Sequence, residues 1–228
     1  MNLPGLVGGI APESTVDYYR RILAEYQRRN PGSVAPHLLI HSISSGTLLK
    51  LAEHDRPQLA AYLLESLRVL EGGGATFAAF LSNTPHLVFD VLERESPLPL
   101  VGIVNAVVDV AVTQGFKRLG LLGTGFTMRA DFYPNACRPR GIEVIVPRPD
   151  ALAEIHARYV GELAKGVFRP DTRDLVMDAI DRMVSDDNVD AVVLGGTELP
   201  ILLESVTAPP VPLLNTLTIH VTAIVDRM

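Results

Sequence analysis

Short apolar runs alternate with segments of helical periodicity along this chain, and this alternation limits its fold more than any other feature. The runs are almost continuously apolar, which predicts parallel strands buried on both faces rather than half-exposed ones. Strands are expected at residues 3–9, 37–43, 76–82, 98–104, 117–124, 141–147, 189–196 and 211–215. Helices are expected at residues 13–30, 56–70, 85–92, 104–114, 150–165, 171–185 and 219–227. The pattern therefore predicts a doubly wound α/β fold with parallel sheets.

The two halves of the chain also resemble each other. GLVGGIAPE, which begins at Gly5, is echoed by GLLGTGFTM from Gly120. This self-similarity predicts two similar domains related by a pseudo-two-fold axis, with an active-site cleft between them. Proline pairs at 97/99 and 209/210 interrupt the pattern and indicate where the chain passes from one domain to the other. We expect one domain at 1–98, completed by 211–228, and a second at 99–210.

Two polar segments follow apolar runs at similar places in the two halves. SNTPH begins at Ser82 after TFAAFL, and GGTE begins at Gly195 after DAVVL. Each segment is expected where a strand ends and a helix begins, because unpaired backbone N–H groups there bind carboxylates and phosphates in α/β proteins. Neither segment contains a cysteine. Two such segments in equivalent halves predict one site for a small anionic ligand.

Composition excludes several classes of protein. The 228 residues are 47% hydrophobic and only 20% charged, which suffices for buried cores. No stretch approaches the roughly 20 apolar residues of a membrane span, and the N-terminus lacks the features of a signal peptide, so we expect a cytoplasmic protein without membrane contact. The net charge of -6 and dispersed basic residues argue against nucleic acid as a partner. The sequence has no metal-ligand spacing and no phosphate-binding loop, so no metal and no cofactor are expected.

Taken in order, the motifs resemble the cofactor-independent aspartate/glutamate racemase family. GLVGGIAPESTVDYYRRI is similar to the family's opening strand and helix, and SNTPHLVFD to its first catalytic loop. GLLGTGFTM, GIEVIVP, ELAKGVF, VVLGGTELPILL and NTLTIH follow in the family's order and extend the resemblance nearly from end to end. The resemblance implies a homodimer that binds an amino acid or another small carboxylate. It also implies a mechanism in which two cysteines carry protons on opposite faces of the α-carbon.

The positions that match those cysteines hold Ser82 and Gly196, so the two-thiol mechanism is excluded. Other positions are retained. Lys165 in ELAKG matches a lysine implicated in substrate binding, and the remaining matches surround the substrate carboxylate in the family: Asn83, Thr84, Thr124 and Thr197. The closing Asn-Thr-Leu differs from the Asp-Thr-Thr that is common in the family. No residue near Leu48 matches the arginine with which some members bind the distal carboxylate of the substrate. The resemblance therefore implies a weaker specificity for aspartate. The resemblance thus predicts that carboxylate binding is kept while proton transfer is altered.

Each candidate residue also has a structural alternative. Asn83 and Thr84 are typical helix-capping residues ahead of a proline. An unperturbed histidine titrates near neutrality, and His86 lies close in sequence to Ser82, yet it could equally be a structural residue of the helix. Glu198 is a candidate proton carrier, although a negative charge in a first helical turn is favoured without any catalytic role. A cysteine at position 196 would be resisted if this glycine has a positive φ.

Three functions remain open from the sequence. The first is a racemase-family isomerase that transfers a proton at the α-carbon with groups other than thiols, such as Ser82 with His86, or Glu198. The second is a sister reaction, the decarboxylation or isomerisation of a small dicarboxylate. The third is a noncatalytic protein that binds a carboxylate. Cys137 lies outside both polar segments and is expected to be an inert thiol.

Overall fold

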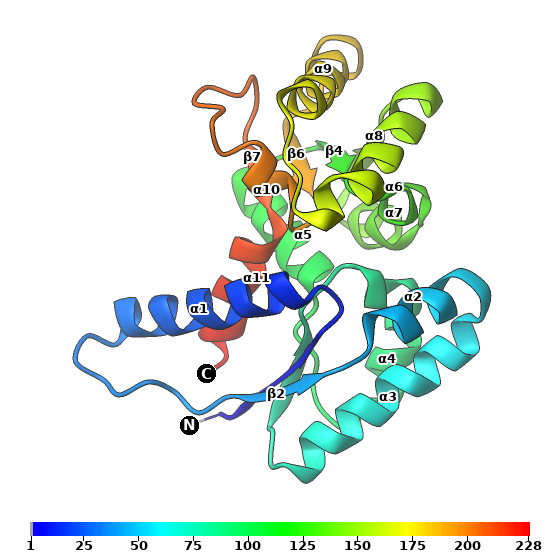
Figure 1. Cartoon of the computed structure of the whole chain (residues 1–228). Coiled ribbons are helices and arrows are strands. Elements are labelled where there is room, and N and C mark those ends of the chain that lie inside the picture. The colour runs from blue at the N-terminus through cyan, green and yellow to red at the C-terminus, as the bar shows by residue number, and fades with distance from the viewer. Residues whose placement is uncertain (1) are drawn as a thin grey trace. The chain divides into compact units, whose positions relative to one another are not determined.

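The computed structural model describes residues 2–228, which form two compact units. The first unit comprises the chain up to Ala106 together with Leu217–Met228, and the second comprises Val107–Thr216 (Figure 1). Each unit contains one sheet whose strands are all parallel, with helices in the connections. The α/β class and the two similar halves predicted from the sequence are therefore confirmed.

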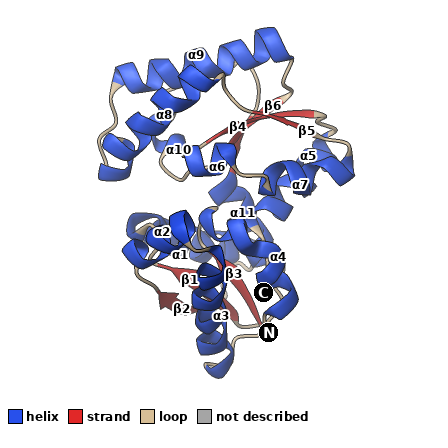
Figure 2. Ribbon diagram, turned by 90° about the vertical axis from the view of Figure 1, so that its right-hand side faces the viewer, coloured by secondary structure: helices blue, strands red, loops and turns tan. Residues whose placement is uncertain are grey.

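The sheet of the first unit has the strand order β2-β1-β3. Its strands are β1 (Pro4–Gly8), β2 (Leu39–Ser42) and β3 (Phe77–Phe80), drawn in red in Figure 2. Successive side chains of β1 point to opposite faces of the sheet, so Leu6 and Val7 belong to different hydrophobic clusters. Both faces of this sheet are therefore buried.

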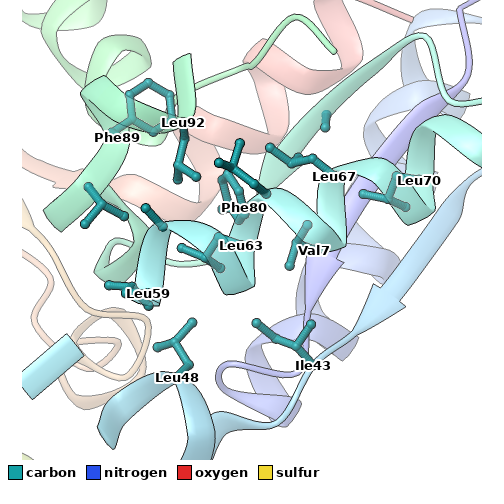
Figure 3. Packing of buried hydrophobic residues seen from close by; sticks show 14 of the residues in the cluster. Val7, Ile43, Leu48, Leu59, Leu63, Leu67, Leu70, Phe80, Phe89 and Leu92 are labelled. Carbon is teal, nitrogen blue, oxygen red and sulfur yellow. The ribbon is translucent and has the colours of Figure 1, made fainter. Parts of the chain in front are cut away.

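Helices cover each face of the first sheet. On one face, Leu63 and Leu67 of α3 pack in the cluster that contains Val7 and Phe80 (Figure 3). On the other face, α1 and α11 enclose Leu6. The helical elements that contribute to this unit are α1 (Pro12–Arg29), α2 (Ser45–His54), α3 (Arg56–Gly72), the 3₁₀ helix η1 (Thr84–Val88), α4 (Phe89–Glu95) and α11 (Thr216–Asp226). This two-sided cover is the doubly wound arrangement.

The sheet of the second unit has the order β5-β4-β6-β7. Its strands are β4 (Arg118–Leu122), β5 (Glu143–Ile145), β6 (Ala191–Leu194) and β7 (Leu213–Asn215). The helical elements that contribute to this unit are α5 (Ile103–Gln114), which begins in the first unit, α6 (Gly125–Arg129), α7 (Phe132–Cys137), η2 (Arg138–Arg140), α8 (Pro149–Gly161), η3 (Leu163–Lys165), α9 (Pro170–Asp187) and α10 (Leu199–Leu202). The first three strands repeat the order of the first sheet, with β4 in the place of β1.

The strand expected at 98–104 is wrong in extent. Only a single parallel bridge forms there, between Leu100 and Ala78, and α5 already begins at Ile103. Pro97 and Pro99 have no backbone N–H to donate, so this segment cannot form a continuous ladder of hydrogen bonds with β3. The bridge lies beside β3 as β7 lies beside β6, so the two halves remain equivalent in order.

Several helices were not expected from the sequence: α2, α6, α7 and α10. All have ten residues or fewer, which leaves little room for helical periodicity to show. The longer helices agree with expectation. Buried residues Tyr18, Ile22 and Tyr26 recur every four positions along α1, for example, as the helical period requires. Across residues 2–228, none of the helices has the length and apolar character to cross a membrane.

Candidate functional site

In the first unit, Ser82 and Asn83 follow β3, and Thr84 and His86 lie in the adjoining η1; we call the segment 82–86 the β3 loop. The half-buried Ser82 hydroxyl accepts a hydrogen bond from the Thr84 N–H at 3.3 Å. Asn83 is buried and occupies the N-cap position of η1, but its side chain makes no capping hydrogen bond. The capping alternative for Asn83 is therefore not supported. Ser82 closes the turn instead.

His86 is buried against an aromatic ring. Its imidazole stacks on Phe89, with ring centroids 4.3 Å apart and planes at 12°. Burial, with a smaller contribution from His220, lowers the pKa of His86 to about 3, so the ring is neutral at pH 7. A base with so acidic a conjugate acid accepts protons poorly near neutrality. These properties favour the structural interpretation of His86, and its pairing with Ser82 in catalysis stays a prediction.

A second buried histidine is fixed by two hydrogen bonds. His220 Nε2 lies 2.9 Å from the Val101 carbonyl oxygen, which can only accept, so this nitrogen carries the proton. The Tyr18 hydroxyl, 3.0 Å away, then donates to Nδ1. Burial lowers the pKa of His220 to about 4. His220 is thus a neutral link between α11, α1 and the segment before α5.

In the second unit, Gly123 and Thr124 follow β4 and form what we call the β4 loop. The Thr124 hydroxyl caps α6 by accepting the Thr127 N–H at 3.3 Å. The Gly125 N–H donates to His156 Nδ1 of α8 at 3.0 Å. The Nε2 atom of a neutral His156 therefore carries the proton. Nothing in the sequence points to His156, because it lies 31 residues from Gly125 on a different helix.

The loop after β6 contains residues 195–198, and we call it the β6 loop. It lies beside the β4 loop, because the Gly195 N–H donates to the Leu122 carbonyl at 2.7 Å. The Glu198 carboxylate accepts hydrogen bonds from the Thr197 hydroxyl at 3.0 Å and from the Tyr159 hydroxyl. Tyr159 comes from α8, one turn after His156. Sequence reasoning selected Thr197 and Glu198 but missed Tyr159.

Gly196 has no room for a side chain. A Cβ built on Gly196 would lie 2.7 Å from Cζ and 2.8 Å from Cε2 of Tyr159, and closer still to its hydroxyl. The glycine does not have a positive φ, so the strain considered from the sequence is absent. A packing conflict with Tyr159 takes its place. The ring and hydroxyl of Tyr159, from α8, therefore fill the space that a side chain at position 196 would need.

The remaining candidates lie apart from these contacts. Lys165 is exposed at the end of η3, just before Gly166 in the left-handed region. Cys137 is fully buried, and burial raises its pKa to about 11. A thiol with that pKa is protonated at pH 7 and unreactive. Among residues 2–228, no cluster of histidine, cysteine and acidic side chains is arranged to hold a metal ion.

The fold and these loops define an α/β protein of two similar parallel-sheet halves, with hydroxyl and acidic side chains where strands end. The chain belongs to the Asp/Glu/Hydantoin racemase family, whose family model matches residues 7–224.

Individual relatives agree with this membership. The chain is 24% identical to RacX, a broad specificity amino-acid racemase of Bacillus subtilis strain 168, over 62% of this chain and 63% of that protein. It spans under two thirds of the length of the curated relatives that it matches.

Among solved structures, a candidate Asp/Glu racemase from Yersinia pestis superposes with a TM-score of 0.92 at 30% identity, covering 100% of this chain and 99% of that one. An aspartate racemase homologue from Pyrococcus horikoshii OT3 has a TM-score of 0.84 at 31% identity, with the same coverage.

Proposed function

We propose that this protein binds a small amino acid or related carboxylate and transfers a proton at its α-carbon without a thiol. The observation that carries the proposal is the Glu198 carboxylate, which is held by two hydroxyl groups at the end of β6. Family membership supports the reaction class, and the absence of cysteine from both loops excludes thiols as carriers.

The chemistry needs both a base and stabilisation of the negative charge left on the substrate. An α-proton is weakly acidic, and hydrogen-bond donors around the substrate carboxylate stabilise the resulting anion. The Thr124 hydroxyl and the Asn83 amide are proposed for this role, with Thr84 and Lys165 as further binding residues. Thr197 is proposed to turn its single O–H from Glu198 to the ligand carboxylate when a ligand binds. Ser82 and Glu198 are the proposed proton carriers.

A noncatalytic carboxylate-binding protein is the second candidate. Two observations favour it. His86 has a pKa of about 3 and is a poor base to activate Ser82, and position 196 carries no side chain. Such a protein would bind its ligand and leave the α-hydrogen untouched.

The deciding experiment is α-hydrogen exchange in heavy water, followed by proton NMR across both enantiomers of the common amino acids and small 2-substituted carboxylates. Ligand-observed NMR on the same samples reports binding. Exchange supports the enzyme, and binding without exchange supports the second candidate. Neither binding nor exchange across the whole set refutes both.

A threonine variant tests the binding residues. Thr197→Val should raise KM or Kd by about 5-fold, since a lost hydrogen bond is worth about 1 kcal/mol. Thr113→Val is the matched control, because the exposed Thr113 hydroxyl bonds only to the Asp109 carbonyl of its own helix. Equal effects of the two changes would argue against a ligand at the β6 loop.

We also propose, from the family resemblance, a homodimer in the cytoplasm. Light scattering coupled to size-exclusion chromatography measures the oligomeric state directly.

A further inference from the structure

The space that a side chain at position 196 would need is filled by the ring and hydroxyl of Tyr159. The two ring carbons nearest the missing Cβ lie 2.7 and 2.8 Å from its ideal position, and the hydroxyl oxygen lies nearer. The Tyr159 oxygen is therefore the polar atom found where the first atoms of a residue-196 side chain would be. Gly196 and Tyr159 fit each other sterically.

The Tyr159 hydroxyl is not isolated. It donates a hydrogen bond to Glu198 Oε2, and the same oxygen accepts from Thr197 at 3.0 Å. Glu198 is partly exposed, whereas Tyr159 is only 5% exposed. The pair thus links a buried phenol beside Gly196 to a carboxylate that solvent reaches.

We propose that the Tyr159 hydroxyl carries the proton in the place where a side chain at position 196 would lie. Glu198 is the carboxylate that takes the proton from Tyr159 and returns it. This inference rests on the proposed function and extends it to a residue that the resemblance did not select. It identifies the substrate as a carbon acid whose α-hydrogen is removed or delivered on the face next to Gly196.

The proton balance of the step is simple. The Cα–H bond breaks, and its electron pair stays on the substrate. The proton forms a new O–H bond with the phenolic oxygen while the original phenolic proton moves to Glu198 Oε2. Tyr159 is neutral before and after, and Glu198 changes from carboxylate to carboxylic acid. Delivery to the carbon is the same transfer in reverse.

A relay of this kind agrees with the environment of the phenol. Burial, and next the charge of Glu198, raise the pKa of Tyr159 well above its usual value, so a free phenolate is strongly disfavoured. In the relay no phenolate forms, because the oxygen gains one proton as it loses another.

The neighbouring histidine is not arranged to replace Tyr159. His156 comes from the same helix, but its Nδ1 accepts the Gly125 N–H, and its ring meets Phe126 edge to face at 5.8 Å. Its contacts tie α8 to the start of α6. We therefore assign His156 to the positioning of the β4 loop.

The test compares Tyr159→Phe with wild type in heavy water, starting separately from the L and the D enantiomer of the amino acid that wild type exchanges fastest. Phenylalanine keeps the ring and removes only the hydroxyl. We expect the exchange rate from one enantiomer to fall by about 100-fold or more, the usual loss on removing a general acid–base group. Exchange from the other enantiomer should change far less, and racemisation should be lost.

The asymmetry between enantiomers separates a proton carrier from a structural residue, since misfolding or a weakened site slows both directions alike. Glu198→Gln should give the loss for the same enantiomer as Tyr159→Phe, because an amide cannot take the relayed proton. Tyr133→Phe, at another buried tyrosine of this unit, and Glu204→Gln, at an exposed glutamate, are the controls and should behave like wild type.

The outcomes are distinguishable. Suppose that wild type exchanges the α-hydrogen. If the exchange rates of Tyr159→Phe equal those of wild type, or fall equally for both enantiomers, the relay is overturned and the proposed function is left intact. Absence of exchange in wild type with every compound overturns both.

Discussion

Replacing Gly196 by alanine tests the packing between Tyr159 and the β6 loop directly. Because Gly196 does not have a positive φ, Gly→Ala would ordinarily stabilise the fold by about 0.4–1 kcal/mol. Here the new methyl group meets the Tyr159 ring at 2.7 and 2.8 Å. Overpacking of this kind costs about 1–3 kcal/mol. Displacing the Tyr159 hydroxyl from Glu198 costs roughly 1.5–3 kcal/mol more, since a hydrogen bond to a charged group is lost.

The sum predicts that Gly196→Ala lowers the free energy of unfolding by about 1.5 to 5.5 kcal/mol, after allowance for the ordinary gain. The chain has no tryptophan, so unfolding in urea is best followed by far-ultraviolet circular dichroism. Gly161→Ala is the matched control. It lies in α8 of the same unit, nothing lies within 4 Å of its added Cβ, and it should be neutral or stabilising.

A double-mutant cycle identifies the partner. In a Tyr159→Phe background the penalty of Gly196→Ala should shrink, because no hydroxyl remains to be displaced. If Gly196→Ala proves as stable as Gly161→Ala, the Tyr159 side chain moves aside at no cost in stability and the steric argument is wrong. The same conflict bears on restoring a thiol, since Gly196→Cys has to displace Tyr159 before it can act.

Three further predictions follow from the buried groups and the β3 loop. Cys137 is buried and has a pKa of about 11, so it should not react with a disulfide reagent in the native protein and should react fully in denaturant. Any activity should survive alkylating reagents. Rapid labelling of the native protein, or loss of activity in the folded protein, contradicts the assignment of Cys137 as an inert thiol. His86 and His220 have folded pKa values of about 3 and 4, below the ordinary 6.5, so the unfolded chain takes up more protons and stability should fall as the pH drops from 6.5 towards 4, by up to about 1.4 kcal/mol per pH unit for each histidine. Urea unfolding at pH 7, 5.5 and 4.5 measures this slope, which His86→Phe should reduce; a stability that is flat over this range refutes it. Ser82→Cys should raise α-hydrogen exchange from one enantiomer by at least 10-fold, since a thiolate is a much better base than a hydroxyl, and no gain in a folded variant removes Ser82 from the proton carriers.

Much of the architecture follows from the sequence itself. The apolar runs are long enough, and separated regularly enough, to predict parallel strands, and the echo between Gly5 and Gly120 predicts two similar halves. The carboxyl ends of parallel strands lie at one edge of a sheet, so residues that follow two neighbouring strands in the sequence lie close together in space. The sequence grouped Thr124 with Thr197 only through the family resemblance, and the pairing of β4 with β6 is what brings the ends of these two strands together. The sequence could not show that the segment at 98–104 forms only a single bridge, because two prolines limit its ladder without removing its apolar character.

The side-chain contacts of the candidate site were decided by tertiary structure alone. Tyr159 and Glu198 are 39 residues apart, and their hydrogen bond depends on how α8 lies against the end of β6. Helical periodicity tells which face of α8 is buried but not which loop that face meets. The same holds for His86, whose pKa is set by the surrounding apolar packing rather than by its neighbours in sequence. Local sequence determines what a strand end can offer to a ligand, and packing between distant elements determines which of those groups are charged, held in place or replaced.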